Sequence, residues 1–207
     1  MPRLASHLPH RPGAALALCA ALAFAGFASA AQALTLHGVD IPPQVDVAGK
    51  TLVLNGAGTR YVFLFKVYTA ALYLPQKSTQ PQAIFNMPGP KELRLTMLRD
   101  VSGKELGDKL NEGIKNNLTP EEFTSFIPSL AQLGALFAQK SQLKTGETVT
   151  IRDIPGKGST IAIDGVPSGG TFTDPQFFNS MLKIWLGKDP AEERLKRALL
   201  GNTADSN

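Results

Sequence analysis

Apolar residues recur along this chain with two periods, every second residue in some segments and every third or fourth in others. The first period is typical of β-strands and the second of α-helices. Segments with the strand period come first, followed by a helical block, a second group of strands and a final helical block. We predict strands at residues 34–41, 51–54, 60–74, 92–98, 147–154 and 159–163, with a tight hairpin at Asp164-Gly165 leading into another strand.

Residues 60–74 are the most strand-like segment, with apolar, aromatic and β-branched residues at both odd and even positions. This pattern predicts a central strand that is covered on both faces. The segment is long for one strand, so we expect a bend or a division into two strands. The preceding residues, 55–58, read Asn-Gly-Ala-Gly and are interpreted as a tight turn, since they lack the spacing and the lysine of a phosphate-binding loop.

Four helices are predicted, each with a recognisable start. Ser102 and Glu105 form a capping box before the first helix. Thr119-Pro120 opens the second, and Pro128 within it should produce a kink or a split. An Asp-Pro pair opens each of the other two, and a glycine follows each of them. The predicted ranges are 102–118, 119–137, 174–187 and 189–201.

This order of elements predicts an α+β fold. Parallel sheets require strands and helices to alternate singly, whereas here they come in blocks. We therefore expect an antiparallel sheet with the helices gathered on one of its faces.

The first thirty residues have the three parts of a secretory signal peptide. Two arginines precede an apolar run at 13–27, and Ala28-Ser29-Ala30 supplies small residues for cleavage after Ala30, with Ala33 as an alternative site. The apolar run is shorter than the roughly 20 residues of a membrane-spanning helix. We predict a signal peptide at 1–30 and a periplasmic or secreted product without a transmembrane segment.

The remainder is interpreted as one domain, residues 31–201, followed by a short disordered tail at 202–207. The whole chain carries 21 lysines and arginines against 17 acidic residues, without the dense basic stripe of a nucleic-acid binding protein. Removal of the signal peptide would remove Cys19 and leave His37 as the single histidine. A disulfide, a histidine-based metal site and a histidine triad are therefore not expected, and no cofactor motif is present.

Three polar side chains punctuate the long apolar strand. If the strand runs without a bulge, Arg60, Lys66 and Tyr68 face the same way. An arginine beside a phenol suits a carboxylate or another oxyanion, so an apolar cleft with an Arg/Tyr end is one hypothesis. The alternative is that Arg60 lies at an exposed strand start, Lys66 extends to solvent and Tyr68 belongs to the core.

The same region resembles a known family. Residues 54–60 (LNGAGTR) and 66–74 (KVYTAALYL) are similar to the G-A-G-x-R and K-x-Y/F-x-x-x-x-Y-L segments of the chalcone isomerase-like superfamily. Residues 95–106 resemble its next strand and helix start, and residues 178–187 and 199–201 resemble its C-terminal helices. The resemblance spans most of residues 47–201 and identifies the chain as a member of the exported bacterial branch.

This resemblance implies an open-faced β-sandwich, in which a large antiparallel sheet carries a layer of helices with a ligand cleft between them. Within the superfamily, plant chalcone isomerases close a chalcone to a flavanone, whereas plastid fatty-acid binding relatives hold a carboxylate with an Arg and a Tyr. Arg60 matches the arginine of both groups, and Tyr68 matches the tyrosine of the fatty-acid binders. The candidate ligand-binding residues are Arg60, Lys66, Tyr68, Thr96, Leu106 and Phe178.

Three polar positions of the isomerases are not polar here. The expected tyrosine falls on Leu106, the helix asparagine on Gly113 and a hydroxyl residue near Phe178. The resemblance therefore favours a non-catalytic protein that binds a fatty acid or similar amphipathic carboxylate. Two alternatives stay open: an isomerase or intramolecular lyase that uses Arg60 to stabilise a phenolate or enolate, and an envelope interaction protein with a vestigial cleft.

Overall fold

The computed structural model describes residues 33–202. The predicted signal peptide at 1–30 lies outside these residues, as does most of the predicted tail. The strands of the described residues are between two and thirteen residues long, and the main sheet has seven of them. These are β3 (Gln44–Val47), β4 (Lys50–Val62), β5 (Phe65–Leu74), β6 (Lys91–Met97), β9 (Thr148–Ile154), β10 (Gly158–Ile163) and β11 (Val166–Phe172).

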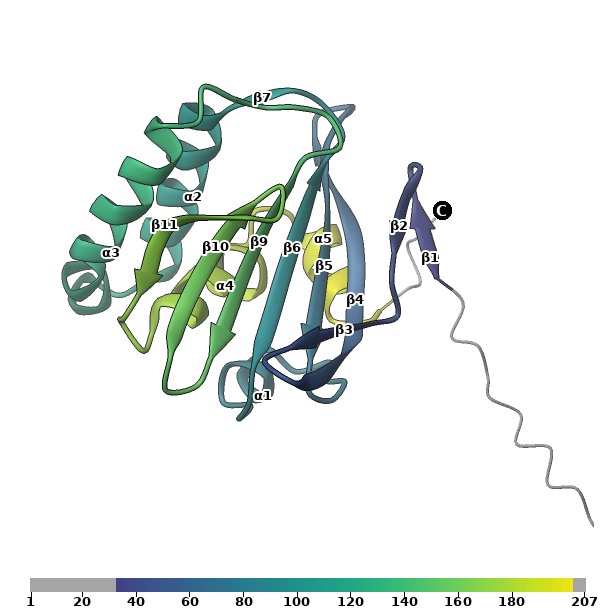
Figure 1. Cartoon of the computed structure of the whole chain (residues 1–207), viewed down its shortest axis with the longest axis horizontal. Coiled ribbons are helices and arrows are strands. Elements are labelled where there is room, and N and C mark those ends of the chain that lie inside the picture. The colour runs from purple at the N-terminus through teal and green to yellow at the C-terminus, as the bar shows by residue number, and fades with distance from the viewer. Residues whose placement is uncertain (1–32, 203–207) are drawn as a thin grey trace, which may run out of the picture. The chain divides into compact units, whose positions relative to one another are not determined.

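The sheet is antiparallel throughout and has the order β11-β10-β9-β6-β5-β4-β3. It curls around the helices, as Figure 1 shows. Two further pairs of short strands lie outside it: β1 (Leu34–Leu36) with β2 (Val39–Ile41), and β7 (Val101–Ser102) with β8 (Gln142–Leu143). The predicted α+β class with an antiparallel sheet is confirmed.

Four helices pack against one face of this sheet. They are α2 (Gly103–Asn117), α3 (Pro120–Ala138), α4 (Phe177–Leu186) and α5 (Glu193–Leu199). A shorter helix, α1 (Pro81–Phe85), lies between β5 and β6 in the chain, at the lower end of the sheet in Figure 1. The helices cover the side on which β5 and β6 present large apolar residues at alternate positions, among them Leu72, Leu93 and Leu95.

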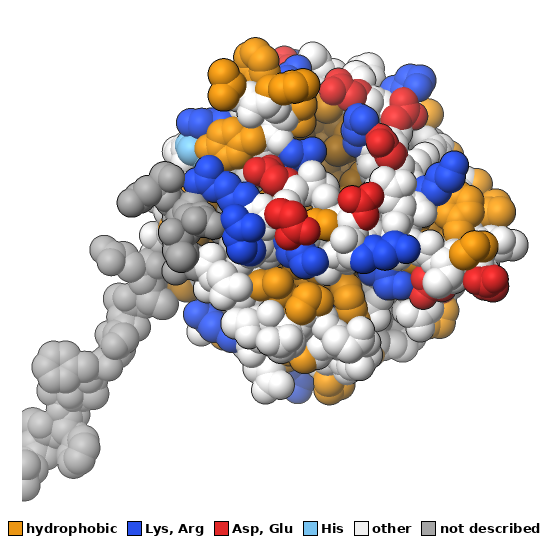
Figure 2. Space-filling view, turned by 180° about the vertical axis from the view of Figure 1, so that it is seen from behind, with side chains coloured by type: hydrophobic (Ala, Val, Ile, Leu, Met, Phe, Trp, Pro, Cys, Tyr) orange, Lys and Arg blue, Asp and Glu red, His pale blue; other side chains and the backbone are white. Residues whose placement is uncertain are grey.

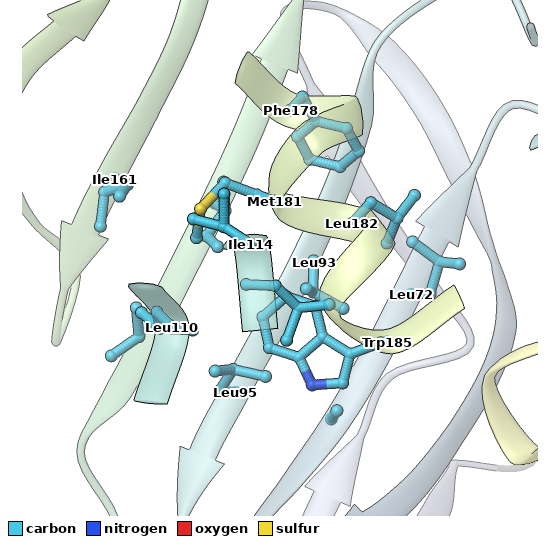
Figure 3. Packing of buried hydrophobic residues seen from close by; sticks show 14 of the residues in the cluster. Leu72, Leu93, Leu95, Leu110, Ile114, Ile161, Phe178, Met181, Leu182 and Trp185 are labelled. Carbon is cyan, nitrogen blue, oxygen red and sulfur yellow. The ribbon is translucent and has the colours of Figure 1, made fainter. Parts of the chain in front are cut away.

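The main core lies between α4, α2 and the sheet. Figure 3 shows Met181 and Trp185 of α4 directed toward Leu93 and Leu95 of β6, with Ile114 of α2 beside them. Trp185 is 1% exposed, and the leucines of β6 are equally inaccessible. This packing fixes the position of α4 and α2 relative to the sheet.

A second, smaller apolar cluster covers part of the opposite face. Ile41 and Val47 from the N-terminal strands pack with Leu52, Ala71 and Tyr73 of β4 and β5. The Tyr73 hydroxyl donates to the carbonyl oxygen of Pro42 at 3.1 Å. Consequently β5 is buried on both faces, as its apolar residues at odd and even positions predict.

Most predicted helix starts and strands are found. Ser102 accepts a hydrogen bond from the Glu105 amide, and Thr119 and Glu122 complete a capping box at α3. The predicted division of residues 60–74 is also found, since β4 turns into β5 at residues 63–64. A split at Pro128 was wrong: α3 continues through this exposed position.

Two strand predictions were wrong in their boundaries. Residues 34–41 form a hairpin with a turn at His37-Gly38, where both residues have positive φ. Residues 55–58 are no turn but the middle of β4, with Asn55 as the extra residue of a bulge against β5. The Asn55 amide donates to the Leu199 carbonyl at 2.7 Å, and its oxygen accepts from the Ser78 amide at 2.7 Å.

The glycines of this segment serve close packing with α5. A Cβ placed on Gly56 would lie 2.1 Å from the Ala198 carbonyl oxygen, and one on Gly58 would lie 2.6 Å from the Ala198 Cβ. Both distances are too short for a real contact, so α5 can lie this close to β4 only if these residues lack side chains. Arg60, two residues after Gly58, lies on the same helix-facing side of β4.

Candidate functional site

A cleft of about 360 Å³ opens between the β4–β5 hairpin and α2, where the segment before α5 closes one side. The hollow is visible near the top of Figure 2, with blue and red side chains around it. Its inner wall is mainly apolar and comes from strands, α2 and α4. The principal apolar residues are Val62, Val67, Val101, Leu106, Leu110 and Ile184.

Arg60 lies at one end of the cleft, on the helix-facing side of β4. Its Nη1 donates to the Tyr61 carbonyl oxygen and lies 3.3 Å from Oε2 of Glu192. The structure gives Nε and Nη2 no partner among residues 33–202. A guanidinium carries five N–H donors, so donors remain for an anion.

Tyr68 is the cross-strand partner of Arg60 on β5 and lines the same cleft. Its hydroxyl accepts a hydrogen bond from Nε1 of Trp185 at 3.0 Å. Burial raises the pKa of Tyr68 above its ordinary value of 10.0, against the opposing effects of Trp185 and Arg60. The phenol therefore stays protonated at neutral pH, and its proton has no acceptor among the described residues.

Glu192 is the acidic partner at this end of the cleft. Its carboxylate accepts the Tyr61 amide at 2.8 Å in addition to contacting Arg60. It reaches β4 because the chain returns across the sheet in the segment between α4 and α5. Arg60 is thus partly neutralised, and Glu192 holds it beside the strand.

Charged residues of both signs surround the entrance. They are exposed, in contrast to the buried Tyr68 and Leu106 deeper in the cleft. On the basic side are Arg99 and Lys109, and on the acidic side Glu105, Glu112 and Asp189. The cleft therefore has a polar rim, a polar end at Arg60 and an apolar interior, which is the arrangement of many small-molecule sites.

Three of the six candidate ligand-binding residues come together here: Arg60, Tyr68 and Leu106. Lys66 does not line the cleft, and its Nζ lies 3.0 Å from Nδ1 of His37. The reason is a bulge at Val67, because Arg60 pairs with Tyr68 while Tyr61 pairs with Lys66. The extra residue turns Lys66 to the opposite side. The condition under which Lys66 and Tyr68 would share a face, a strand without a bulge, is therefore not met.

Thr96 and Phe178 also lie away from the cleft. Thr96 pairs with Thr69 and alternates with the helix-facing Leu95 and Met97, which places it on the other face of the sheet. Phe178 is 2% exposed in the core, with Nζ of Lys91 6.0 Å from its ring centre.

No group of three or more His, Cys, Asp or Glu residues within 33–202 is arranged to hold a metal ion. In the same part of the chain, no helix has the length and apolar character needed to cross a bilayer. The side chains of the cleft offer anion pairing, hydrogen-bond donation and apolar contact.

The model of the chalcone isomerase-like family matches residues 33–201, which is nearly the whole described region. This chain belongs to the chalcone isomerase-like family. No curated protein sequence matches it. Among solved structures, a fatty-acid binding protein of Arabidopsis thaliana shares its fold with a TM-score of 0.64 at 16% identity, covering 83% of this chain and 97% of the plant protein.

Two positions at which the resemblance to chalcone isomerases implies a polar side chain, 106 and 113, are not polar here, and the structure shows what surrounds each of them. Leu106 adds an apolar surface to the cleft instead of a phenol. At Gly113, a Cβ would lie 2.8 Å from Cγ2 of Ile184, so the isoleucine occupies the room that a larger side chain would need. Both substitutions make the interior of this chalcone isomerase-like cleft more apolar.

Sequence reasoning missed Glu192 and Arg99 as members of the site. Glu192 lies 132 residues after Arg60 in the chain, and no local pattern marks either residue. The placement of Glu192 depends on how the last helices close over β4 in this chalcone isomerase-like fold, whereas Arg99 lies in the short connection between β6 and β7. The G-A-G-x-R segment was the one available signal, since its glycines admit α5 and its arginine faces the cleft.

Proposed function

We propose that this chalcone isomerase-like protein binds a fatty acid or similar amphipathic carboxylate in the cleft and does not convert it. One observation carries the proposal. The free donors of Arg60 and the protonated hydroxyl of Tyr68 lie on paired residues at one end of an apolar cleft. The fatty-acid binding protein of Arabidopsis supports it, because a protein of the same fold carries that name.

The polar end suits a carboxylate for two reasons. The N–H groups of a guanidinium match the two oxygens of a carboxylate in the same plane. A phenol that keeps its proton adds a third donor, and the raised pKa of Tyr68 ensures that it does so at neutral pH. A carboxylate bound there would share Arg60 with Glu192, which already lies 3.3 Å from it.

The apolar body of the cleft suits a hydrocarbon chain. Leu106, Leu110 and Ile184 line it beyond Tyr68. Its volume of about 360 Å³ is near the lower end of the range for small-molecule sites, roughly 300–1,000 Å³. A ligand with one flexible chain therefore fits better than a rigid polycyclic one.

Binding of a fatty acid can be measured by calorimetry with delipidated protein, using laurate and palmitate. We expect saturable binding that weakens by about tenfold or more in Arg60→Gln, because a buried charge-assisted contact is lost. Lys77→Gln removes an exposed positive charge outside the cleft and serves as the matched control. An absence of saturable binding to the wild-type protein would refute the proposal.

The second candidate is an isomerase or intramolecular lyase, and the acid beside Arg60 is the observation in its favour. Arg60 would stabilise a phenolate or enolate, and Glu192 would accept a proton. However, the carboxylate of Glu192 already contacts both Arg60 and the Tyr61 amide, so it is not free to approach a substrate proton. Loss of chalcone absorbance above the buffer rate, abolished by Arg60→Ala, would favour this candidate over the binding protein.

Export to the periplasm is part of the proposal and rests on sequence alone. The segment at 1–30 has a basic start, an apolar run and small residues before the cleavage point. Mass spectrometry of the protein from a periplasmic fraction should give an N-terminus at residue 31 or 34. Full-length protein in the cytosolic fraction would contradict export while leaving ligand binding untouched.

A further inference from the structure

The turn between β4 and β5 exposes four consecutive apolar residues, which we call the hairpin tip. Phe63 is 93% exposed, Leu64 92%, Phe65 66% and Val62 41%. In Figure 2, apolar side chains gather at the same end of the molecule, beside the hollow of the cleft. Scattered exposed apolar residues are ordinary, but a contiguous group that includes two phenylalanines indicates an interaction surface.

The backbone of the hairpin tip is strained at Phe63. Val62 pairs with Phe65, so Phe63 and Leu64 form a two-residue turn, and Phe63 has a φ of 54°. Positive φ at the first turn position normally selects glycine, and a bulky residue there is strained. Phe63 is therefore unfavourable in two ways: its backbone has a strained positive φ, and its apolar ring is exposed to water. Neither disadvantage is compensated by packing within the fold, which points to a function of the exposed ring.

The charged residues of the hairpin strands beside the tip are basic, whereas the rim of the neighbouring cleft carries both signs. The hairpin is flanked by Arg60 and Lys66, and the sequence has no acidic residue between Asp46 and Glu92. Basic residues beside an apolar group favour an anionic lipid surface, because the charges contact headgroups while the apolar side chains enter the interface. A turn that protrudes also suits a soft bilayer, which needs no complementary groove.

We propose that the hairpin tip docks this protein on an anionic lipid bilayer, with Phe63, Leu64 and Phe65 inserted among the headgroups. Val62 belongs both to the tip and to the lining of the cleft. Docking therefore brings the cleft entrance to the lipid surface. Transfer of a fatty acid between bilayer and cleft would follow, and that step alone rests on the proposed function.

Co-sedimentation with vesicles tests the docking without any fatty acid. The wild-type protein is expected to bind vesicles of phosphatidylcholine and phosphatidylglycerol, and to bind pure phosphatidylcholine vesicles less well. Phe63→Gly should weaken binding by about tenfold, since it removes one large apolar side chain from the interface. Glycine also suits the positive φ at this position, so the variant is expected to fold, and circular dichroism checks that it does.

Ile127→Ser is the matched control, because Ile127 is an equally apolar residue on α3 that is 52% exposed outside the tip. It should bind vesicles as the wild-type protein does. Equal binding by wild type and Phe63→Gly, or no binding to anionic vesicles, would overturn the proposal. If sedimentation velocity instead shows self-association that Phe63→Gly abolishes, the tip is an interface between copies of this chain.

Discussion

At the level of single residues, Arg60 and Glu192 together set the charge at the polar end of the cleft. Arg60 uses one nitrogen for Tyr61 and Glu192, and the acid is fixed by the Tyr61 amide. Tyr68 is held by Trp185 in the same region. A ligand carboxylate would thus meet an arginine that is already positioned. It would also compete with Glu192 for that arginine.

That competition gives a prediction for Glu192→Gln. The glutamine can still accept the Tyr61 amide, but it removes the negative charge 3.3 Å from Arg60. We expect a fatty acid to bind roughly threefold to tenfold more tightly, as repulsion between two carboxylates is relieved near the protein surface. The same calorimetry measures this change, and weaker binding would mean that Glu192 is needed to orient Arg60.

Tyr73 gives a prediction for alkaline stability. Burial raises its pKa to about 12. The unfolded chain loses this proton near pH 10, so the folded state binds more protons between about pH 10 and about pH 12, and stability falls as pH rises through that range. Tyr73→Phe should be less stable at pH 7 by about 1 kcal/mol, since the bond to Pro42 is lost.

Urea unfolding at several pH values checks this prediction. The decline in the free energy of unfolding between about pH 10 and about pH 12 should be shallower in Tyr73→Phe than in the wild type. Equal slopes in the two proteins would show that the ionisation of Tyr73 is not coupled to folding.

At the level of elements, β4 combines several functions along one strand. Its bulge at Asn55 ties the end of α5 to the sheet, its glycines admit α5, and Arg60 enters the cleft. The strand then ends in the hairpin tip. Because Glu192 immediately precedes α5, a shift of α5 would displace Glu192 from Arg60.

Gly56→Ala tests the role of this close packing. The added Cβ would lie 2.1 Å from the Ala198 carbonyl oxygen, so α5 must move away from β4. We expect a loss of stability of roughly 3 kcal/mol, at the upper end for an overpacked site. In contrast, Gly134→Ala in α3 meets nothing within 4 Å and should stabilise the protein by about 0.5–1 kcal/mol.

Denaturant unfolding of both variants gives the comparison directly. An unchanged stability of Gly56→Ala would mean that α5 is not held by this contact, and the account of the G-A-G-x-R segment would be wrong.

The elements that sequence alone predicted are those with strong local signals. The alternation at 92–98 became β6, and the capping residues Ser102 and Thr119 start α2 and α3. The predictions that were wrong concern segments whose structure depends on contacts with residues far away in the sequence. The segment at 55–58 has the composition of a turn, and only the approach of Ala198 explains why its glycines belong to a strand.

At the level of the whole molecule, the sheet and helices bring residues far apart in the chain to one end of the fold. Arg60 and Tyr68 were predicted as a pair, and the structure places them on neighbouring strands of the cleft. Lys66 was assigned to the same face, but a one-residue bulge reverses its direction. Bulges are set by cross-strand pairing, which a single sequence does not reveal.

The chain belongs to the chalcone isomerase-like family and has the fold of a plant fatty-acid binding protein. We propose that the cleft holds an amphipathic carboxylate through Arg60. All residues that line the cleft, both at its polar end and in its apolar interior, lie within the described range 33–202.

The most direct test is native mass spectrometry of the protein purified from the organism that makes it, alongside Arg60→Gln. We predict an additional mass corresponding to a fatty acid or related carboxylate on the wild-type protein, and its loss in the variant. A wild-type protein that carries no such ligand and takes up none when offered, or a ligand retained equally by Arg60→Gln, would contradict the account.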